Sequence, residues 1–96
     1  MLRLMIVDDE QIIREALSSM IDYTSLGYEV IATAKNGMEA YDRIRDDYPD
    51  VVITDIKMPI LNGLELIERA SRIDSRITFI LLSGYGEFEY AKQAMK

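Results

Sequence analysis

The chain has 96 residues, 49% of them hydrophobic and 29% charged, a composition typical of one soluble globular domain. Its formal net charge is −6 and it has no cluster of Lys and Arg, which argues against direct nucleic-acid binding by this segment. The absence of Cys and His excludes disulfides, thiolate or imidazole zinc sites and His-dependent catalytic triads. Any bound metal ion must therefore have oxygen ligands, which points to Mg²⁺, Mn²⁺ or Ca²⁺.

Membrane insertion and secretion are not indicated. No apolar run approaches the roughly 20 residues that a membrane-spanning helix needs. The N-terminus lacks the long apolar stretch and small-residue cleavage site of a signal peptide. We therefore expect a cytoplasmic protein without membrane contact.

The N-terminal part of the chain predicts a strand, a helix and a second strand. Residues 2–7 (LRLMIV) are apolar apart from Arg3, as expected of a strand buried on both faces. Helical spacing of apolar residues predicts a helix over residues 11–22. These apolar residues are Ile12, Ile13, Ala16, Leu17, Met20 and Ile21. A turn at 24–27 leads into a second strand at 28–34 (YEVIATA).

A second helix is predicted from its capping residues. Asn36 is a favourable N-cap, and Glu39 follows three residues later, as in a capping box. The helix is expected to run to about Tyr48, because Pro49 marks its end. One face of this helix carries Tyr41, Ile44 and Tyr48.

The next segment predicts a buried strand, a loop and a third helix. The β-branched run at 51–54 (VVIT) suits a strand buried on both faces. Residues 55–63 (DIKMPILNG) read as a loop, with Pro59 and the pair Asn62-Gly63 as turn residues. The helix that follows is indicated by Leu64, Ile67, Ala70 and Ile73.

The last segment predicts a strand at 77–82, a loop at 83–86 and a helix that begins at 87. Strands and helices thus alternate along the whole chain, which predicts an α/β three-layer sandwich on a parallel sheet. We expect one domain over residues 1–96. Because the chain stops within a predicted helix without a cap, we also expect it to be a fragment of a longer polypeptide.

Acidic residues follow two of the predicted strands. Asp8, Asp9 and Glu10 follow the first strand, and Asp55 follows the third. In a doubly wound sheet of order 2-1-3-4-5 these strands are neighbours, and ligands bind at their carboxyl ends. Distant acids would then meet in one crevice and repel each other unless a hard divalent cation compensates. The alternative is that these acids are solvated turn residues, with Asp9 capping the first helix.

The segments MIVDDE, VVITDIKMPILNG and LLSGYGEFEYAKQAM, in this order and spacing, resemble the receiver domain of two-component response regulators over the whole chain. The resemblance implies a flavodoxin-like sheet of order 2-1-3-4(-5). It implies that Asp55 is the phosphoacceptor for a sensor histidine kinase. It further implies a Mg²⁺ site in which Asp9 binds directly, Asp8 largely through water, and Lys57 through its backbone carbonyl.

The same resemblance makes Ser83 the switch hydroxyl that contacts the phosphoryl group, although a helix cap or turn residue is its ordinary alternative. Gly84 and Gly86 would permit the loop to move. For the side chain of Lys57, a tuning role in dephosphorylation competes with a plain solvated lysine. The aromatic set Tyr85, Phe88 and Tyr90 resembles regulators with an arabinose-regulator-type helix-turn-helix output domain, or is simple packing.

The chain departs from the family after residue 96. Receivers continue into a fifth strand that carries a phosphoryl-binding lysine, and then a fifth helix; Lys92 and Lys96 are wrongly placed to substitute for that lysine. An open edge of the fourth strand would be a pairing hazard, so we expect further chain, a swapped segment or a partner to cover it. Receivers commonly pair through their fourth and fifth helices, so a homodimer is also implied, with the output domain in cis.

Three functions are compatible with this set of residues. The first is a phosphorylation-dependent switch that assists its own phosphoryl transfer and has no turnover substrate. The second is a Mg²⁺-dependent phosphohydrolase with an aspartyl nucleophile, but such enzymes usually place a second acid where this chain has Lys57. The third is a phosphorylation-independent interaction module of the same fold. Loss of an acid would favour this module, yet all the acids are present.

Overall fold

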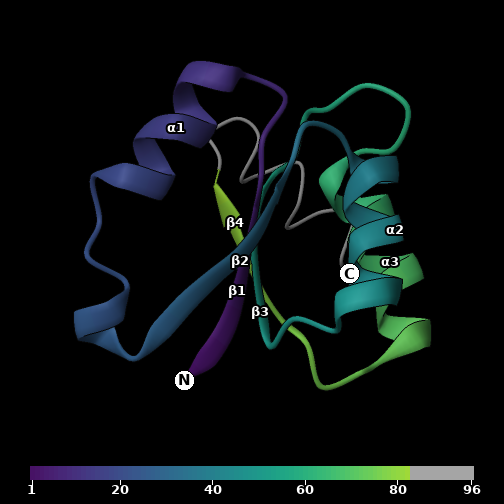
Figure 1. Cartoon of the computed structure of the whole chain (residues 1–96). Helices are drawn as coiled ribbons and strands as arrows, with labels where there is room; N and C mark the ends of the chain where they lie inside the picture. Colours follow the sequence, from purple (N-terminus) through teal and green to yellow (C-terminus); the bar gives the residue numbers. More distant parts are fainter. Residues whose placement is uncertain (83–96) are drawn as a thin grey trace.

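The computed structural model of the protein describes residues 1–82. Its four parallel strands lie in the order β2-β1-β3-β4, as predicted for a doubly wound sheet (Figure 1). The strands are β1 (Leu2–Val7), β2 (Tyr28–Ala34), β3 (Val51–Asp55) and β4 (Thr78–Leu82). All four therefore end at the same edge of the sheet. The predicted loop at 83–86 and the helix from 87 lie outside the described residues.

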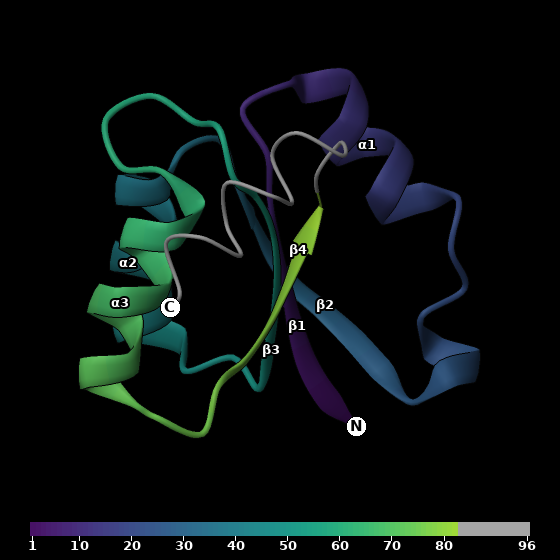
Figure 2. The same ribbon diagram turned by 180° about the vertical axis from the view of Figure 1, so that it is seen from behind.

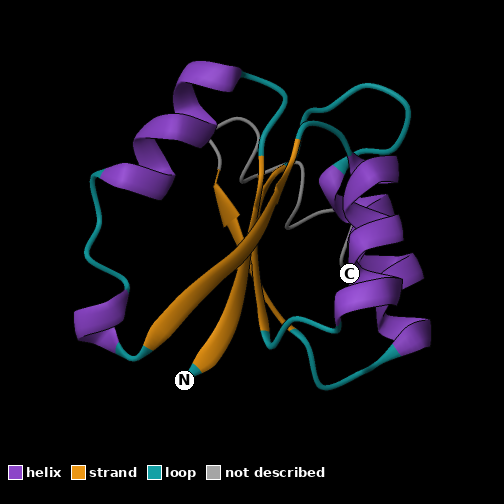
Figure 3. Cartoon of the chain, in the orientation of Figure 1, coloured by secondary structure: helices purple, strands orange, loops and turns teal. Residues whose placement is uncertain are grey.

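Helices cover both faces of the sheet and complete the predicted three layers. Helix α1 (Gln11–Ser19) and the short 3-10 helix η1 (Thr24–Leu26) lie on one face, whereas α2 (Gly37–Asp47) and α3 (Gly63–Ile73) lie on the other. Figure 2 shows the same arrangement from behind, and Figure 3 separates helices from strands by colour. None of the helices in the described part of the chain is long and apolar enough to cross a bilayer.

Strand β1 has apolar side chains on both faces because both are covered. Leu4 and Ile6 belong to the core on the α1 side, and Met5 and Val7 to the core on the α2/α3 side; all four are almost completely buried. Burying one such side chain contributes about 1.5–3 kcal/mol. A one-residue slip of β1 would exchange the two faces, so burial on both sides strongly specifies the register.

Strand β2 contains a β-bulge that the sequence pattern did not indicate. Leu4 pairs with Val30, but the next residue of β1 pairs with Ala32, which leaves Ile31 as the extra residue. Val30, before the bulge, packs against the α1-side core, whereas Ala32 and Ala34 after it belong to the α2/α3-side core. The bulge thus turns the small alanine side chains toward the helix pair.

Helix α1 ends at Ser19, which is earlier than the predicted limit at 22. The chain turns after it because Tyr23 is buried and its hydroxyl donates a hydrogen bond to the carbonyl of Leu17 (2.7 Å). This burial also raises the pKa of Tyr23. Part of the predicted apolar stripe remains exposed, with Ile12 at 80% and Met20 at 81%. Among residues 1–82, no side chain packs over them.

The predicted N-cap of α2 is confirmed, since the Asn36 side chain accepts a hydrogen bond from the Glu39 amide (2.8 Å). Ile44 is buried on the sheet side, as expected. The prediction that Tyr48 shares this face is wrong, because Tyr48 is the C-cap in the left-handed region (φ 48°) and its side chain is exposed. The left-handed residue ends the helix directly before Pro49.

Gly37, the first residue of α2, is buried against the loop that precedes α3. A Cβ at this position would overlap the backbone carbonyl of Leu61. We predict that Gly37→Ala lowers the free energy of unfolding by about 1–3 kcal/mol, because the backbone must shift to relieve the overlap. Met38→Ala is the control, since Met38 is exposed and its truncation should change stability by less than about 0.5 kcal/mol. Urea denaturation measures both; equal stabilities would contradict the close packing.

Candidate functional site

The register of β1 and β3 brings two acids to neighbouring strand ends. Val7 of β1 pairs with Thr54 of β3, and one residue further along stand Asp8 and Asp55. Adjacent strands lie about 4.8 Å apart, so these two residues meet at the carboxyl edge of the sheet. Asp8 is buried and Asp55 is partly buried. On its other side Asp55 pairs with Leu82, the last residue of β4.

Asp8 is held at both its backbone and its side chain. Its amide donates to the carbonyl of Ala34 on β2 (3.1 Å), and its Oδ1 accepts a hydrogen bond from the amide of Glu10 (2.9 Å). The alternative reading of Asp9 as a helix cap is wrong, because Glu10 is the N-cap of α1 and makes no side-chain cap. The local turn bond belongs to Asp8, so the exposed carboxylate of Asp9 is not used to start the helix.

A compact group of carboxylates follows β1. One oxygen each from Asp8, Asp9 and Glu10 lie within 4.8 Å of one another. No Lys or Arg of residues 1–82 forms an ion pair with these three. Oxygen-only, negatively charged donor sets suit a hard divalent cation such as Mg²⁺. Asp55 is not a member of this group and reaches the same edge through the strand register.

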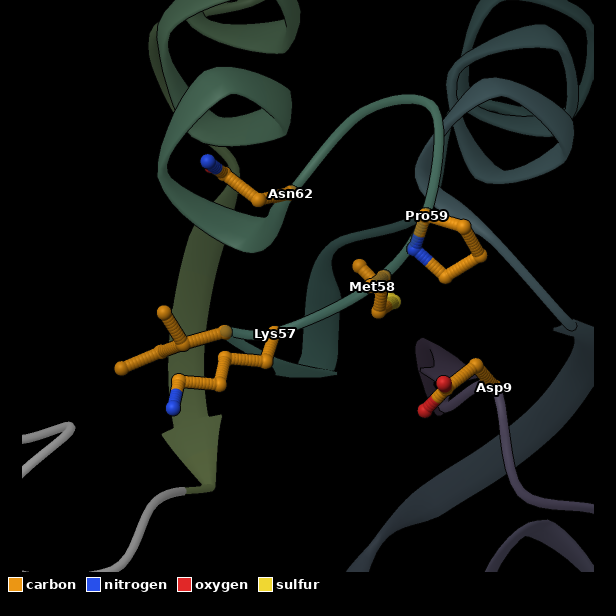
Figure 4. Close-up of a pocket in the computed structure, with 6 residues that line it drawn as sticks. Asp9, Lys57, Met58, Pro59 and Asn62 are labelled. Atoms are coloured by element: carbon orange, nitrogen blue, oxygen red, sulfur yellow. The ribbon is translucent and has the colours of Figure 1, made fainter.

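An open hollow of about 510 Å³ lies beside these acids. Its lining combines one residue from the end of β1 with residues of the loop that follows β3. They are Asp9, Ile56, Lys57, Met58, Pro59 and Asn62. Figure 4 shows Asp9 and Lys57 on opposite sides of this hollow, with Met58 and Pro59 on its wall. The two predicted metal-binding segments therefore border one space.

The loop after β3 fixes the Asp55 carboxylate. The Ile56 amide donates to Asp55 Oδ1 (2.8 Å), and the Gly63 amide donates to the Ile56 carbonyl (2.8 Å), which closes the loop. Gly63 is required because a Cβ there would overlap the Asp55 carbonyl. Ile56, Met58 and Leu61 are buried, which anchors the loop while Lys57 points outward and is exposed.

Helix α3 begins with a capping box that was not predicted from the sequence. The Asn62 side chain accepts from the Glu65 amide (2.9 Å), and the Glu65 carboxylate accepts from the Asn62 amide (3.1 Å). The spacing Asn62-x-x-Glu65 is the signal for this box, and it overlaps the Asn62-Gly63 pair, which by itself indicates a turn. The box ends the loop that borders the hollow and starts the helix beside it.

Ile60 occupies an unfavourable backbone conformation in the same loop. Its φ is 72°, and the Leu61 amide donates to the Pro59 carbonyl (2.8 Å) across it, as in a γ-turn with positive φ. Such a conformation is uncommon for any L-residue and a clear outlier for a β-branched one. The side chain is 76% exposed, so packing of Ile60 itself does not explain the strain.

Not every predicted site residue can be placed. Ser83, Gly84, Gly86 and the aromatic set at 85–90 lie outside the described residues. The role of the Lys57 backbone carbonyl as a metal ligand stays a prediction, although the residue borders the hollow that Asp9 also lines.

A doubly wound parallel sheet with carboxylates at the ends of its adjacent central strands defines an α/β protein with a site at the carboxyl edge. The family model of the response regulator receiver domain matches residues 4–96. The chain therefore belongs to the response regulator receiver family, as its motifs indicated.

Known proteins of this family resemble the chain over its full length. The transcriptional regulatory protein YesN of Bacillus subtilis is 49% identical over 96 residues, which is all of this chain but 26% of YesN. The crystal structure of a two-component transcriptional regulator AraC from Clostridium phytofermentans has a TM-score of 0.93 at 34% identity, covering 100% of this chain and 74% of that one. CheY in the CheX-CheY-BeF3-Mg complex of Borrelia burgdorferi gives 0.83 at 28% identity, over 98% and 70%.

The strain at Ile60 gives a prediction. Ile60→Gly should raise the free energy of unfolding by about 1 kcal/mol, because Gly adopts positive φ without the steric penalty. Ile60→Val keeps the branched side chain and should give no such gain. Thermal or urea unfolding compares the two variants with the wild type. A loss of stability in Ile60→Gly would contradict the assignment of strain.

Proposed function

We propose that this protein is a signalling switch in which Asp55 accepts a phosphoryl group from a sensor histidine kinase. A Mg²⁺ ion would be held by Asp8, Asp9, Asp55 and the backbone carbonyl of Lys57. The observation that carries the proposal is the parallel register that sets Asp55 beside Asp8, next to the carboxylate group of Asp8, Asp9 and Glu10.

The proposed chemistry is transfer to a carboxylate. A carboxylate oxygen of Asp55 attacks phosphorus, the bond from phosphorus to the donor's imidazole nitrogen breaks, and that nitrogen keeps the electron pair. The product is an acyl phosphate on Asp55. The hydrogen bond from the Ile56 amide to Oδ1 orients this carboxylate before the reaction.

The donor set supports a role for Mg²⁺. Carboxylates at the edge of the sheet repel the anionic phosphoryl group. Bound Mg²⁺ would neutralise the charge of the carboxylates and stabilise the negative charge on the phosphoryl oxygens during transfer. The related Borrelia CheY forms a complex that contains BeF3 and Mg²⁺, which supports the same pocket chemistry here. The hollow beside Asp9 and Lys57 offers the space for the incoming phosphoryl group.

The relay beyond the site is proposed from the family. Ser83 follows Leu82, the partner of Asp55 on β4, and we propose that its hydroxyl binds a phosphoryl oxygen. An arabinose-regulator-type DNA-binding output domain in cis is supported by the likeness to the Clostridium regulator. A cytoplasmic location and pairing with a second copy follow from the same family.

The two other functions remain as outcomes of the test. A phosphohydrolase is disfavoured because Lys57 stands two residues after Asp55, where such enzymes usually have an acid. An inert interaction module is disfavoured because the acids and the paired strand ends are all present.

Phosphorylation is tested by incubating the intact protein with Mg²⁺ and acetyl phosphate. We predict one hydroxylamine-labile phosphate per chain, seen by intact mass, that does not form in Asp55→Asn or when EDTA is present from the start in place of free Mg²⁺. Asp46→Asn, an exposed acid on α2, is the matched control and should be phosphorylated like the wild type. A labile phosphate that persists in Asp55→Asn would contradict the proposal. Rapid multiple turnover of phosphate esters would favour the phosphohydrolase. If no phosphorylated protein forms at all, the result would favour the inert interaction module.

Metal binding is tested separately by thermal unfolding. Mg²⁺ at about 100 times its dissociation constant should stabilise the wild type by about 2.7 kcal/mol. Asp9→Asn should lose most of this gain, yet be at least as stable as the wild type in EDTA, because one charge is removed from a repelling group. An equal Mg²⁺ effect in Asp9→Asn would exclude Asp9 as a ligand.

A further inference from the structure

Arg14 on α1 reaches back to the residue that carries the buried acid. Its Nη1 donates a hydrogen bond to the backbone carbonyl of Asp8 (2.7 Å), in a partly buried position. The guanidinium therefore contacts the main chain of the acidic segment rather than one of its carboxylates. The contact is made by a residue of α1 and could not be predicted from the acidic residues Asp8, Asp9 and Glu10 themselves.

The main chain of Arg14 is anchored as well. Its amide donates to the carbonyl of Glu10 (3.0 Å), and its own carbonyl accepts a hydrogen bond from the Ser18 hydroxyl (2.7 Å). Arg14 thus holds the acidic segment at two points, through the first turn of α1 and through its side chain. The segment cannot shift along the helix axis without breaking both.

These contacts complete the fixation of Asp8. Its amide is bound by Ala34 of β2, its Oδ1 by the Glu10 amide, and its carbonyl by Arg14. Three atoms of one residue are therefore tied to a strand, a turn and a helix. The position of the Asp8 carboxylate beside Asp55 depends on all three ties.

We propose that Arg14 is a positioning residue for the metal and phosphoryl site, which sets the affinity for the divalent cation by fixing the Asp8 main chain. The inference rests on the proposed function, because it requires that Asp8 and Asp9 hold the cation. It extends the site to α1, which supplies none of the proposed ligands.

The positive charge of Arg14 and its hydrogen bond to Asp8 have opposite effects on the affinity for Mg²⁺. A guanidinium next to a cation site repels the cation, so removing its charge alone would tighten Mg²⁺ binding. Removing its hydrogen bond frees the Asp8 segment and would weaken binding, as loss of residues that orient metal ligands typically does by about 10–100-fold. The direction of the change therefore identifies which effect dominates.

The test is the Mg²⁺ dissociation constant of the intact protein, measured by isothermal titration calorimetry without any phosphodonor. Arg14→Met keeps an unbranched stem and removes both the charge and the donors. We expect it to bind Mg²⁺ at least about 10-fold more weakly than the wild type. Arg69→Met is the matched control, an equal charge change at an exposed position of α3 on the opposite face of the sheet, and should leave the affinity unchanged.

Unchanged or tighter binding in Arg14→Met would overturn the inference. If the melting temperature in EDTA falls while the Mg²⁺ affinity stays unchanged, Arg14 stabilises the fold only, and the inference is likewise overturned. If Arg14→Met does not fold, Arg14→Gln decides, because its shorter side chain removes the charge and falls short of the Asp8 carbonyl: weaker binding supports the positioning role and wild-type affinity overturns it. A wild type that binds no Mg²⁺ would instead contradict the proposed function, so the two failures are distinguishable.

Discussion

The parallel pairing of β1 with β3 is the constraint on which the whole site depends. Val7 and Thr54 are fully buried partners, and the acids that follow them inherit their alignment. A slip of one residue would turn the side chains that pack on the α1 side toward α2 and α3, and the reverse, so packing on both covered faces enforces the register. The core thus determines where the charges meet, and the free energy of packing offsets the repulsion between Asp8 and Asp55.

The loop after β3 meets a tight spatial demand at this edge. It must cover the α2/α3-side core with Met58 and Leu61, yet leave the Asp55 carboxylate partly exposed at the carboxyl edge of the sheet. Gly63 permits close approach to the Asp55 carbonyl, and the left-handed backbone at Ile60 reverses the chain. Strain of about 1–2 kcal/mol at one residue is tolerated because the buried neighbours hold the loop in place.

The sequence predicted most of the framework, because apolar runs and helical periodicity reflect burial on both faces of a covered sheet. The predicted limits of β1 and β2 match the structure, and those of β3 and β4 differ by one residue. The bulge at Ile31 was not predictable from the sequence. It changes which face of the sheet the following side chains occupy, and only the packing of Ala32 and Ala34 in the α2/α3-side core shows this change. The early end of α1 likewise depends on the burial of Tyr23. For the site, the meeting of Asp8 with Asp55 followed from strand order, whereas the contact of Arg14 is tertiary and left no pattern in the sequence.

The central claim, that one ion is shared by the ends of β1 and β3, is tested most directly by paramagnetic broadening with Mn²⁺ in place of Mg²⁺. Amide signals of the intact protein are followed by NMR during a Mn²⁺ titration. The account predicts that Asp9 and Ile56 broaden together with one dissociation constant, while Arg3 and Asp50 at the opposite end of the sheet stay sharp. Broadening of Asp9 without Ile56 would contradict it.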